Sequence, residues 1–178
     1  MIRGVRVTVA VIILALGMSS CRDWNRAPYG PILQPAFGAR VTDGRLEIWP
    51  GPGCVGITRV GITFEPSNAQ LVLNSSDKQG VDLDRFELGG PYPAGLQVSK
   101  PLPVGYDWRT SRSIRLSLDG GSSAWGTATD TAEVVKGSPN HADGTFWFQD
   151  VGWLNSDEVV ARNGKTFLAS CTHNPPKK

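Results

Sequence analysis

Residues 113–118 have the sequence Ser113-Ile114-Arg115-Leu116-Ser117-Leu118, in which every second side chain is apolar. This period of two is that of a β-strand with one buried face and one polar face. The same alternation recurs along the chain, in residues 45–49, 59–64, 71–73, 104–109 and 146–148. We therefore expect each of these segments to form a short strand.

Runs of turn-forming residues separate the expected strands. They are Asp43-Gly44, Pro50-Gly51-Pro52-Gly53, Gly89-Gly90-Pro91, Asp119-Gly120-Gly121, Asp143-Gly144 and Asn163-Gly164. After the leader, residues 130–136 come nearest to a helical pattern, and this segment is short. Many short strands between turns predict an all-β fold, either an antiparallel β-sandwich or a barrel, in a single domain over residues 40–173. Immunoglobulin-like topology is the default expectation for such a sandwich.

The charge balance argues against a chain that recruits nucleic acid. Of the 18 Lys and Arg residues, Arg3 and Arg6 lie in the first 20 positions, which contain no acid. The other 16 basic residues balance 16 acidic residues. Because binding to nucleic acid depends on an excess of positive charge, we expect no nucleic-acid partner. With 178 residues, 40% of them hydrophobic, the chain can form a folded core.

The N-terminus has the features of an export signal. Arg3 and Arg6 form a positive start, and residues 7–18 follow without a charge. Twelve residues are too few to cross a bilayer as a helix, which needs about 20. A short apolar segment after a basic start is typical of a secretory signal peptide. We therefore assign residues 1–20 to a signal peptide and expect the protein to be exported.

The end of this leader resembles the lipobox of bacterial lipoproteins. The stretch is Met18-Ser19-Ser20-Cys21, and the usual lipobox has Leu at its first position, two small residues and then Cys. The resemblance covers the leader only and implies cleavage before Cys21, with lipid on the Cys21 sulfur. The protein would then be a lipoprotein held at the cell membrane on its extracytoplasmic face. An ordinary cleaved signal and an uncleaved anchor are the alternatives.

Two segments flank the expected domain. Residues 22–39 contain Pro28, Pro31 and Pro35. Helices and central strands tolerate proline poorly, so we expect neither in this segment. We expect residues 21–39 to contain the lipidated Cys21 and a tether, and residues 174–178 to form a frayed tail.

Cysteine arithmetic supports export. The chain has three cysteines, and lipid on Cys21 would leave Cys54 and Cys171. Disulfides persist in the compartments outside the cytoplasm. We expect these two residues to form a disulfide, and two buried free thiols are the alternative.

Motifs that carry chemistry are few. No Gly-x-Ser-x-Gly elbow occurs, and the only close acid–base pair is His141 with Asp143, in a segment that has the composition of an exposed loop. Two histidines 32 positions apart give no metal spacing. The acids at positions 77, 82, 84 and 87 do not match an EF-hand, so solvation in loops explains them better. We expect no cofactor and no metal, and the residues leave enzyme activity open while favouring a protein without it.

Aromatic residues are the remaining candidates for a site. Strand alternation places Trp49 and Trp147 opposite their apolar neighbours, where they could stack on a sugar or bury a partner's side chain. Packing beneath a loop or within the core is the competing interpretation. The first functional hypothesis is a non-catalytic envelope module that binds a protein or a glycan. The alternatives are a hydrolase acting on envelope polymers and a phage-type exclusion or accessory lipoprotein.

Overall fold

The computed structural model describes residues 31–121 and 125–176. The leader, Cys21 and the first part of the expected tether lie outside these residues. Pro31–Lys178 forms one compact unit of the chain. No helix within the described residues has the length and apolar character needed to span a bilayer.

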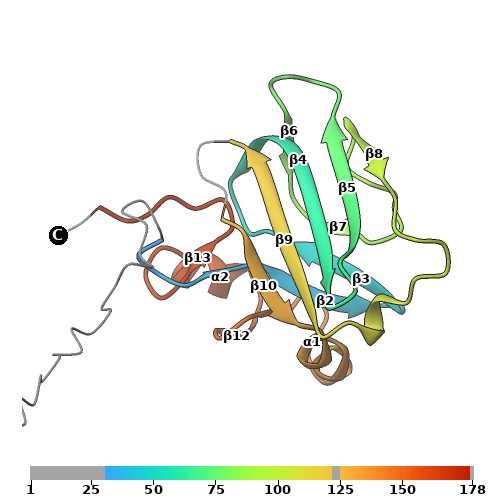
Figure 1. The fold of residues 1–178 in the computed structure, drawn as a ribbon. Helices are drawn as coiled ribbons and strands as arrows, with labels where there is room; N and C mark the ends of the chain where they lie inside the picture. Colours follow the sequence, from blue (N-terminus) through green and yellow to red (C-terminus); the bar gives the residue numbers. More distant parts are fainter. Residues whose placement is uncertain (1–30, 122–124, 177–178) are drawn as a thin grey trace, which may run out of the picture. The chain divides into compact units, whose positions relative to one another are not determined.

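The strands form two antiparallel sheets that pack into a sandwich (Figure 1). The first sheet has the order β10-β9-β4-β5-β8, with β6 also paired to β4. Its strands are β4 (Cys54–Glu65), β5 (Ala69–Ser75), β6 (Val81–Leu83), β8 (Leu96–Lys100), β9 (Ser113–Gly120) and β10 (Thr127–Asp130). The second sheet has the order β12-β11-β2-β3-β7. Its strands are β2 (Gly38–Thr42), β3 (Arg45–Trp49), β7 (Phe86–Glu87), β11 (Phe146–Phe148) and β12 (Gly152–Leu154).

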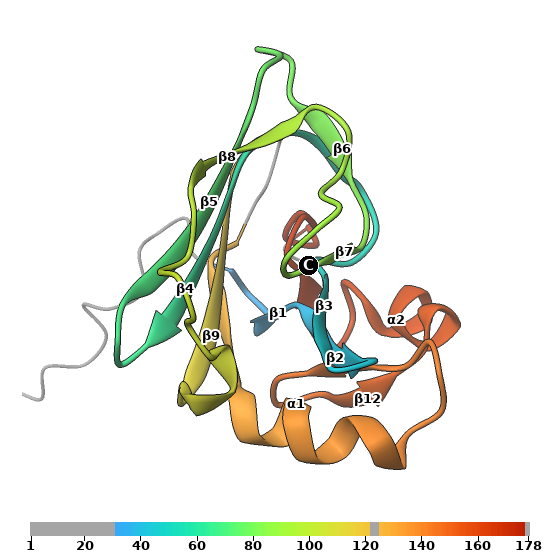
Figure 2. The same ribbon diagram turned by 90° about the vertical axis from the view of Figure 1, so that its right-hand side faces the viewer.

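Smaller elements complete the fold. Strand β1 (Pro35–Ala36) pairs in parallel with β13 (Leu168–Ala169). Helix α1 (Thr131–Gly137) lies at one end of the sandwich, and α2 (Ser156–Arg162) lies beside the second sheet (Figure 2). Two short 3-10 helices are η1 (Trp108–Thr110) and η2 (Ser138–Asn140).

The expected all-β sandwich is confirmed, and the sheets do not close into a barrel. The strand order departs from the immunoglobulin default. Strands β11 and β12 follow β10 of the first sheet and return to the second sheet beside β2. In an immunoglobulin domain the first strands, A and B, and the last strands, F and G, lie in different sheets, whereas here β2, β3, β11 and β12 share one sheet.

The main core lies between the sheets and follows the alternation in the sequence. Strand β4 has Val60, Ile62 and Phe64 on its inner row, and all three are fully buried. They pack in one cluster with Leu46 and Ile48 of β3. The polar residues between them face outward, as a two-residue period requires.

The other face of the second sheet is also buried. Trp49, Phe146 and Phe148 form a second cluster there, with Val159 of α2 and Phe167. The Trp49 ring centroid lies 5.5 Å from that of Phe146 and 5.7 Å from that of Phe148. This sheet is therefore apolar on both faces, because α2 and the chain before β13 cover the face that would otherwise meet solvent.

Helix α2 has no counterpart in the sequence prediction, although its start carries a recognisable signal. The Asn155 side chain accepts a hydrogen bond from the Glu158 amide at 2.9 Å, and the Glu158 carboxylate accepts one from the Asn155 amide at 2.8 Å. This is a capping box. The helix has seven residues, too few for its periodicity to be distinguished from that of a loop.

Two sequence predictions are wrong, one for a strand and one for the extent of the tether. Residues 104–109 are not a strand, because Pro101 and Pro103 interrupt the ladder and the chain turns with the Tyr106 amide donating to the Pro103 carbonyl at 3.1 Å. Residues 35–39 are not part of a tether, because they form β1 and begin β2, and Phe37 is fully buried in the core. The folded domain therefore includes residues 35–39.

The predicted disulfide between Cys54 and Cys171 is confirmed. The two Cα atoms lie 5.1 Å apart, and the bond joins the start of β4 to the segment after β13, across 117 positions of sequence. The chain's last described segment is held further by Asn174, whose side chain accepts a hydrogen bond from the Ile32 amide at 2.8 Å. Asn174, the first residue of the expected frayed tail, is therefore held against the domain.

Replacing both cysteines (Cys54→Ser with Cys171→Ser) should lower the free energy of unfolding by about 4–5 kcal/mol, because a long loop is released in the unfolded chain. Chemical denaturation of the oxidised protein checks this. Each single variant should lose as much as the double variant, since either one removes the same bond. Equal stability, or ready labelling of the unreduced protein by a thiol reagent, would contradict the pairing.

Candidate binding cleft

The two candidate tryptophans do not form an open stacking surface. Trp49 is 4% exposed, and the Arg85 guanidinium carbon lies 4.7 Å from the centroid of its ring. Trp147 is half-buried against the main core. Its indole N–H is buried and has no acceptor among the described residues. Strand alternation is correct that Trp49 lies opposite Leu46 and Ile48, but the face it occupies is covered.

The candidate pair His141 and Asp143 is not assembled as an acid–base site. The Asp143 carboxylate pairs with Arg40 at 3.0 Å, and the His141 ring stacks on Trp153 with centroids 4.4 Å apart. Arg40 is only 6% exposed and also donates to the main-chain carbonyls of residues 141, 142 and 145. A buried guanidinium needs such acceptors, so Arg40 organises this loop from beneath.

Two of the four acidic residues between positions 77 and 87, Asp77 and Glu87, have local partners. Asp77 accepts a hydrogen bond from the Gln79 amide at 2.9 Å, and Glu87 pairs with Arg45 at 3.0 Å. Within residues 31–121 and 125–176, no three His, Cys, Asp or Glu side chains gather as a metal site would require. The lipidation candidate Cys21 lies outside the described residues.

A cleft of about 330 Å³ opens where the two sheets end side by side. Strand β7 is the last strand of the second sheet and β8 is the last strand of the first sheet. The lining residues come from both of these edges, from the β2–β3 turn and from the chain after β8. They are Gly44, Arg45, Leu71, Leu88, Gly89, Tyr92, Val98, Pro101, Leu102, Tyr106 and Trp108.

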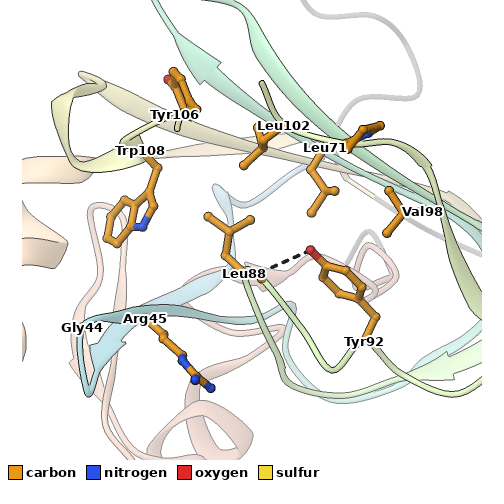
Figure 3. A pocket seen from close by; sticks show the side chains of 11 residues that line it. Gly44, Arg45, Leu71, Leu88, Tyr92, Val98, Leu102, Tyr106 and Trp108 are labelled. Carbon is orange, nitrogen blue, oxygen red and sulfur yellow. Dashed lines mark hydrogen bonds between the residues drawn. The ribbon is translucent and has the colours of Figure 1, made fainter. Parts of the chain in front are cut away.

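The walls of the cleft are mainly apolar. Figure 3 shows the side chains of Leu71, Leu88, Leu102 and Val98 converging on it from opposite sides. Leu71 is buried on β5, and the Leu88 amide donates to the Leu46 carbonyl at 2.8 Å, which holds the chain after β7 against β3. Val98 on the edge strand is 46% exposed. An apolar concave surface of this size is typical of small ligand sites.

Two of the three aromatic side chains of the cleft, Tyr92 and Tyr106, have a hydrogen bond within the protein. The Tyr106 hydroxyl lies 2.8 Å from the Ser67 hydroxyl, and the Tyr92 hydroxyl accepts from the Gly89 amide at 3.2 Å. Trp108 is buried beneath the Arg109 guanidinium, whose central carbon lies 5.0 Å from the ring centroid. The cleft therefore offers apolar surface more than free hydrogen-bonding groups.

The alternation of apolar and polar residues does not predict this cleft. Its lining comes from four separate segments of the chain, residues 44–45, 71, 88–92 and 98–108. Two of its aromatic residues, Tyr106 and Trp108, lie in the stretch that alternation assigned to a strand. Glycine and proline residues do mark the ends of the strands at this edge. They are Gly89, Gly90 and Pro91, and Pro101 and Pro103.

One carboxyl, that of Glu65 at the end of β4, has a perturbed pKa. Hydrogen bonds and charge attraction from Arg115 lower the pKa of Glu65, and Ser113 and Arg112 add to the effect. The Arg115 guanidinium lies 3.0 Å from the Glu65 carboxylate. Glu65 is the last residue of β4, two positions before Ser67, which contacts Tyr106 of the cleft.

A scan against protein-family models and searches of curated proteins and of solved structures find no match to the chain.

Substituting Val98→Glu should weaken binding of the neutral apolar dye N-phenylnaphthylamine roughly tenfold, because it places a charge in the apolar wall. A fluorescence titration measures this effect. Val104→Glu is the matched control, since Val104 is fully exposed and does not line the cleft. Equal weakening by both variants, or by neither, would show that the dye binds elsewhere.

Substituting Arg115→Gln should raise the pKa of Glu65 toward its ordinary value. The folded-state pKa is lowered, so this pair stabilises the fold above the unfolded-state pKa, and the stabilisation is lost as the pH falls through the folded-state pKa. The carboxyl chemical shift of Glu65, followed by NMR against pH, measures the change. Arg59→Gln, which removes an ion pair to Asp119, should leave the Glu65 titration unaltered.

Proposed function

We propose that this chain is an exported lipoprotein, anchored through lipid on Cys21, whose sandwich is a non-catalytic binding module of the bacterial envelope. The disulfide is the observation that carries the proposal. It uses two of the three cysteines, so Cys21 remains as the odd one, at the end of an export leader. Disulfides persist outside the cytoplasm, which agrees with export.

The lipid anchor would hold the domain close to the membrane. Nine residues, 22–30, separate Cys21 from Pro31, the first described residue. A fully extended segment of that length spans about 30 Å. A lipidated Cys21 would therefore keep the domain close to the headgroup layer, and several acyl chains on one terminus would make the attachment stable.

The cleft supports a binding role and indicates the class of ligand. Its walls are leucine, valine and aromatic side chains, and the hydroxyls of Tyr92 and Tyr106 are already hydrogen-bonded. A glycan site needs an open ring together with free polar groups, whereas an apolar side chain needs only a dry concave surface. We therefore assign the cleft to apolar side chains of an envelope protein.

We favour a binding module over a hydrolase for this domain. His141 stacks on Trp153 and Asp143 pairs with Arg40, so the two residues that sequence suggested for acid–base chemistry have different partners.

Cys21→Ser should move the protein from the detergent-rich phase to the aqueous phase in a temperature-induced phase separation. The variant should also lack a diacylglycerol-sized mass addition, because the sulfur that accepts the lipid is absent. Intact-mass measurement of protein purified from membranes checks both chains. The double variant Cys54→Ser with Cys171→Ser is the control and should keep the lipid mass. Wild-type protein that stays in the aqueous phase without added mass would contradict the anchor.

A further inference from the structure

The edge of the first sheet at β8 is open. Strand β8 pairs with β5 on one side, and no other strand of the described residues pairs with it. Figure 1 shows β8 as the last strand of that sheet. Gln97, Val98 and Ser99 are all exposed there. An unpaired strand edge presents main-chain amides and carbonyls with which another chain can pair.

The register of β8 on β5 decides which of its main-chain groups face outward. The Ser76 amide donates to the Gly95 carbonyl at 3.2 Å, so these two opposed residues form a hydrogen-bonded pair. Hydrogen-bonded and non-hydrogen-bonded pairs alternate along an antiparallel ladder. Leu73 lies opposite Val98 three pairs further along, so this pair is of the non-hydrogen-bonded kind. The amide and the carbonyl of Val98 therefore point away from β5, toward the open edge.

The free part of this edge is short. The Leu96 amide points in the same direction as that of Val98 and already donates to the Pro93 carbonyl at 3.1 Å. The register shifts between Val98 and Lys100, as at a β-bulge, and Pro101 follows the strand. Bulges and prolines limit the pairing of an edge. Only a few hydrogen bonds are thus available here, and a bound strand would need side-chain contacts as well.

The cleft lies where the side chains of such a strand would go. Val98 lies opposite Leu73, which is buried in the main core, and its own side chain lines the cleft (Figure 3). Opposed residues of neighbouring strands have their side chains on the same face. A residue paired with Val98 would therefore direct its side chain toward the walls formed by Leu71, Leu88 and Leu102. The residues two positions away would lie on the same face, and those between would face solvent.

We propose that the β8 edge and the cleft together bind an extended segment of an envelope protein, which adds to the first sheet as an antiparallel strand. This inference rests on the proposed function and deepens it, because it names the form of the ligand. Every second side chain of the segment is apolar and enters the cleft, while its main chain bonds to the Val98 amide and carbonyl. The antiparallel direction is that of every strand pair in this sheet. Proteins that recognise peptides by strand addition combine main-chain bonds with pockets for alternate side chains.

The test measures the affinity of a fluorescent peptide in which leucine alternates with threonine, with lysine at both ends for solubility. The protein is the mature chain purified from membranes, in phosphatidylcholine nanodiscs, and empty nanodiscs give the background. A leucine opposite Val98 exchanges both hydrogen bonds with it, so the leucine N–H groups face β8 and the threonine N–H groups face away. N-methylation of the leucines should weaken binding roughly tenfold, whereas N-methylation of the threonines should change it less than about twofold.

Variants of Val98 test the same bond from the side of the protein. Val98→Pro removes the outward amide without removing a bond to β5, and proline is tolerated at such an edge position. It should weaken peptide binding roughly tenfold yet still bind N-phenylnaphthylamine, because the wall stays apolar. Val98→Ala keeps the amide and is the matched control, which should bind the peptide more tightly than V98P. An unchanged melting temperature shows that each variant is folded.

Amide hydrogen exchange locates the bound peptide on the wild-type protein. Peptide binding should slow the exchange of the Val98 amide several-fold. It should leave the Gln97 amide unchanged, because Gln97 and Asn74 form a hydrogen-bonded pair of the ladder to β5.

The outcomes separate strand addition from the docking of side chains alone. Equal effects of the two methylations, or tight peptide binding by V98P, would overturn strand addition and leave a cleft that binds apolar groups. A wild-type dimer in sedimentation that V98P abolishes would show that a second copy covers the edge, which also overturns the proposal. Absence of both dye and peptide binding would overturn the binding module itself. Losses confined to leucine methylation and to V98P support strand addition.

Discussion

The fold depends on strand β4, which is paired on both sides and buries its inner row completely. Val60, Ile62 and Phe64 contact the second sheet, while β9 and β5 flank the strand in the first sheet. Burying a large aliphatic or aromatic side chain contributes about 1.5–3 kcal/mol each, so this row holds the two sheets together. The disulfide from Cys54 then ties the start of the same strand to the last segment of the chain.

The second sheet is covered on both faces, and this explains where a ligand could bind. Helix α2 and Phe167 close its outer face over Trp49, and Trp147 packs against the main core, so neither tryptophan forms an open stacking surface. No such cover lies at the edges formed by β7 and β8, where the chain after β8 contains prolines and forms no strand. The cleft is the space that remains between those two edges, lined by side chains that the core would otherwise bury.

The domain thus has two chemically different sides. One side carries both ends of the described chain, which the hydrogen bond between the Ile32 amide and the Asn174 side chain joins. The other carries the apolar cleft, whose flanking charges, Arg45 with Glu87 and Arg109 with Asp107, are paired.

The sequence alone determined the β class, most strand positions and the pairing of Cys54 with Cys171. Alternation reports the two faces of a strand directly, and treating Cys21 as the candidate for lipidation left only one intramolecular pair. The tertiary structure decided the rest: the burial of Trp49, the inclusion of residues 35–39 in the fold, the role of Arg40 and the existence of the cleft. A local pattern shows which face of a strand is apolar, but whether the other face meets solvent depends on segments distant in sequence that cover it.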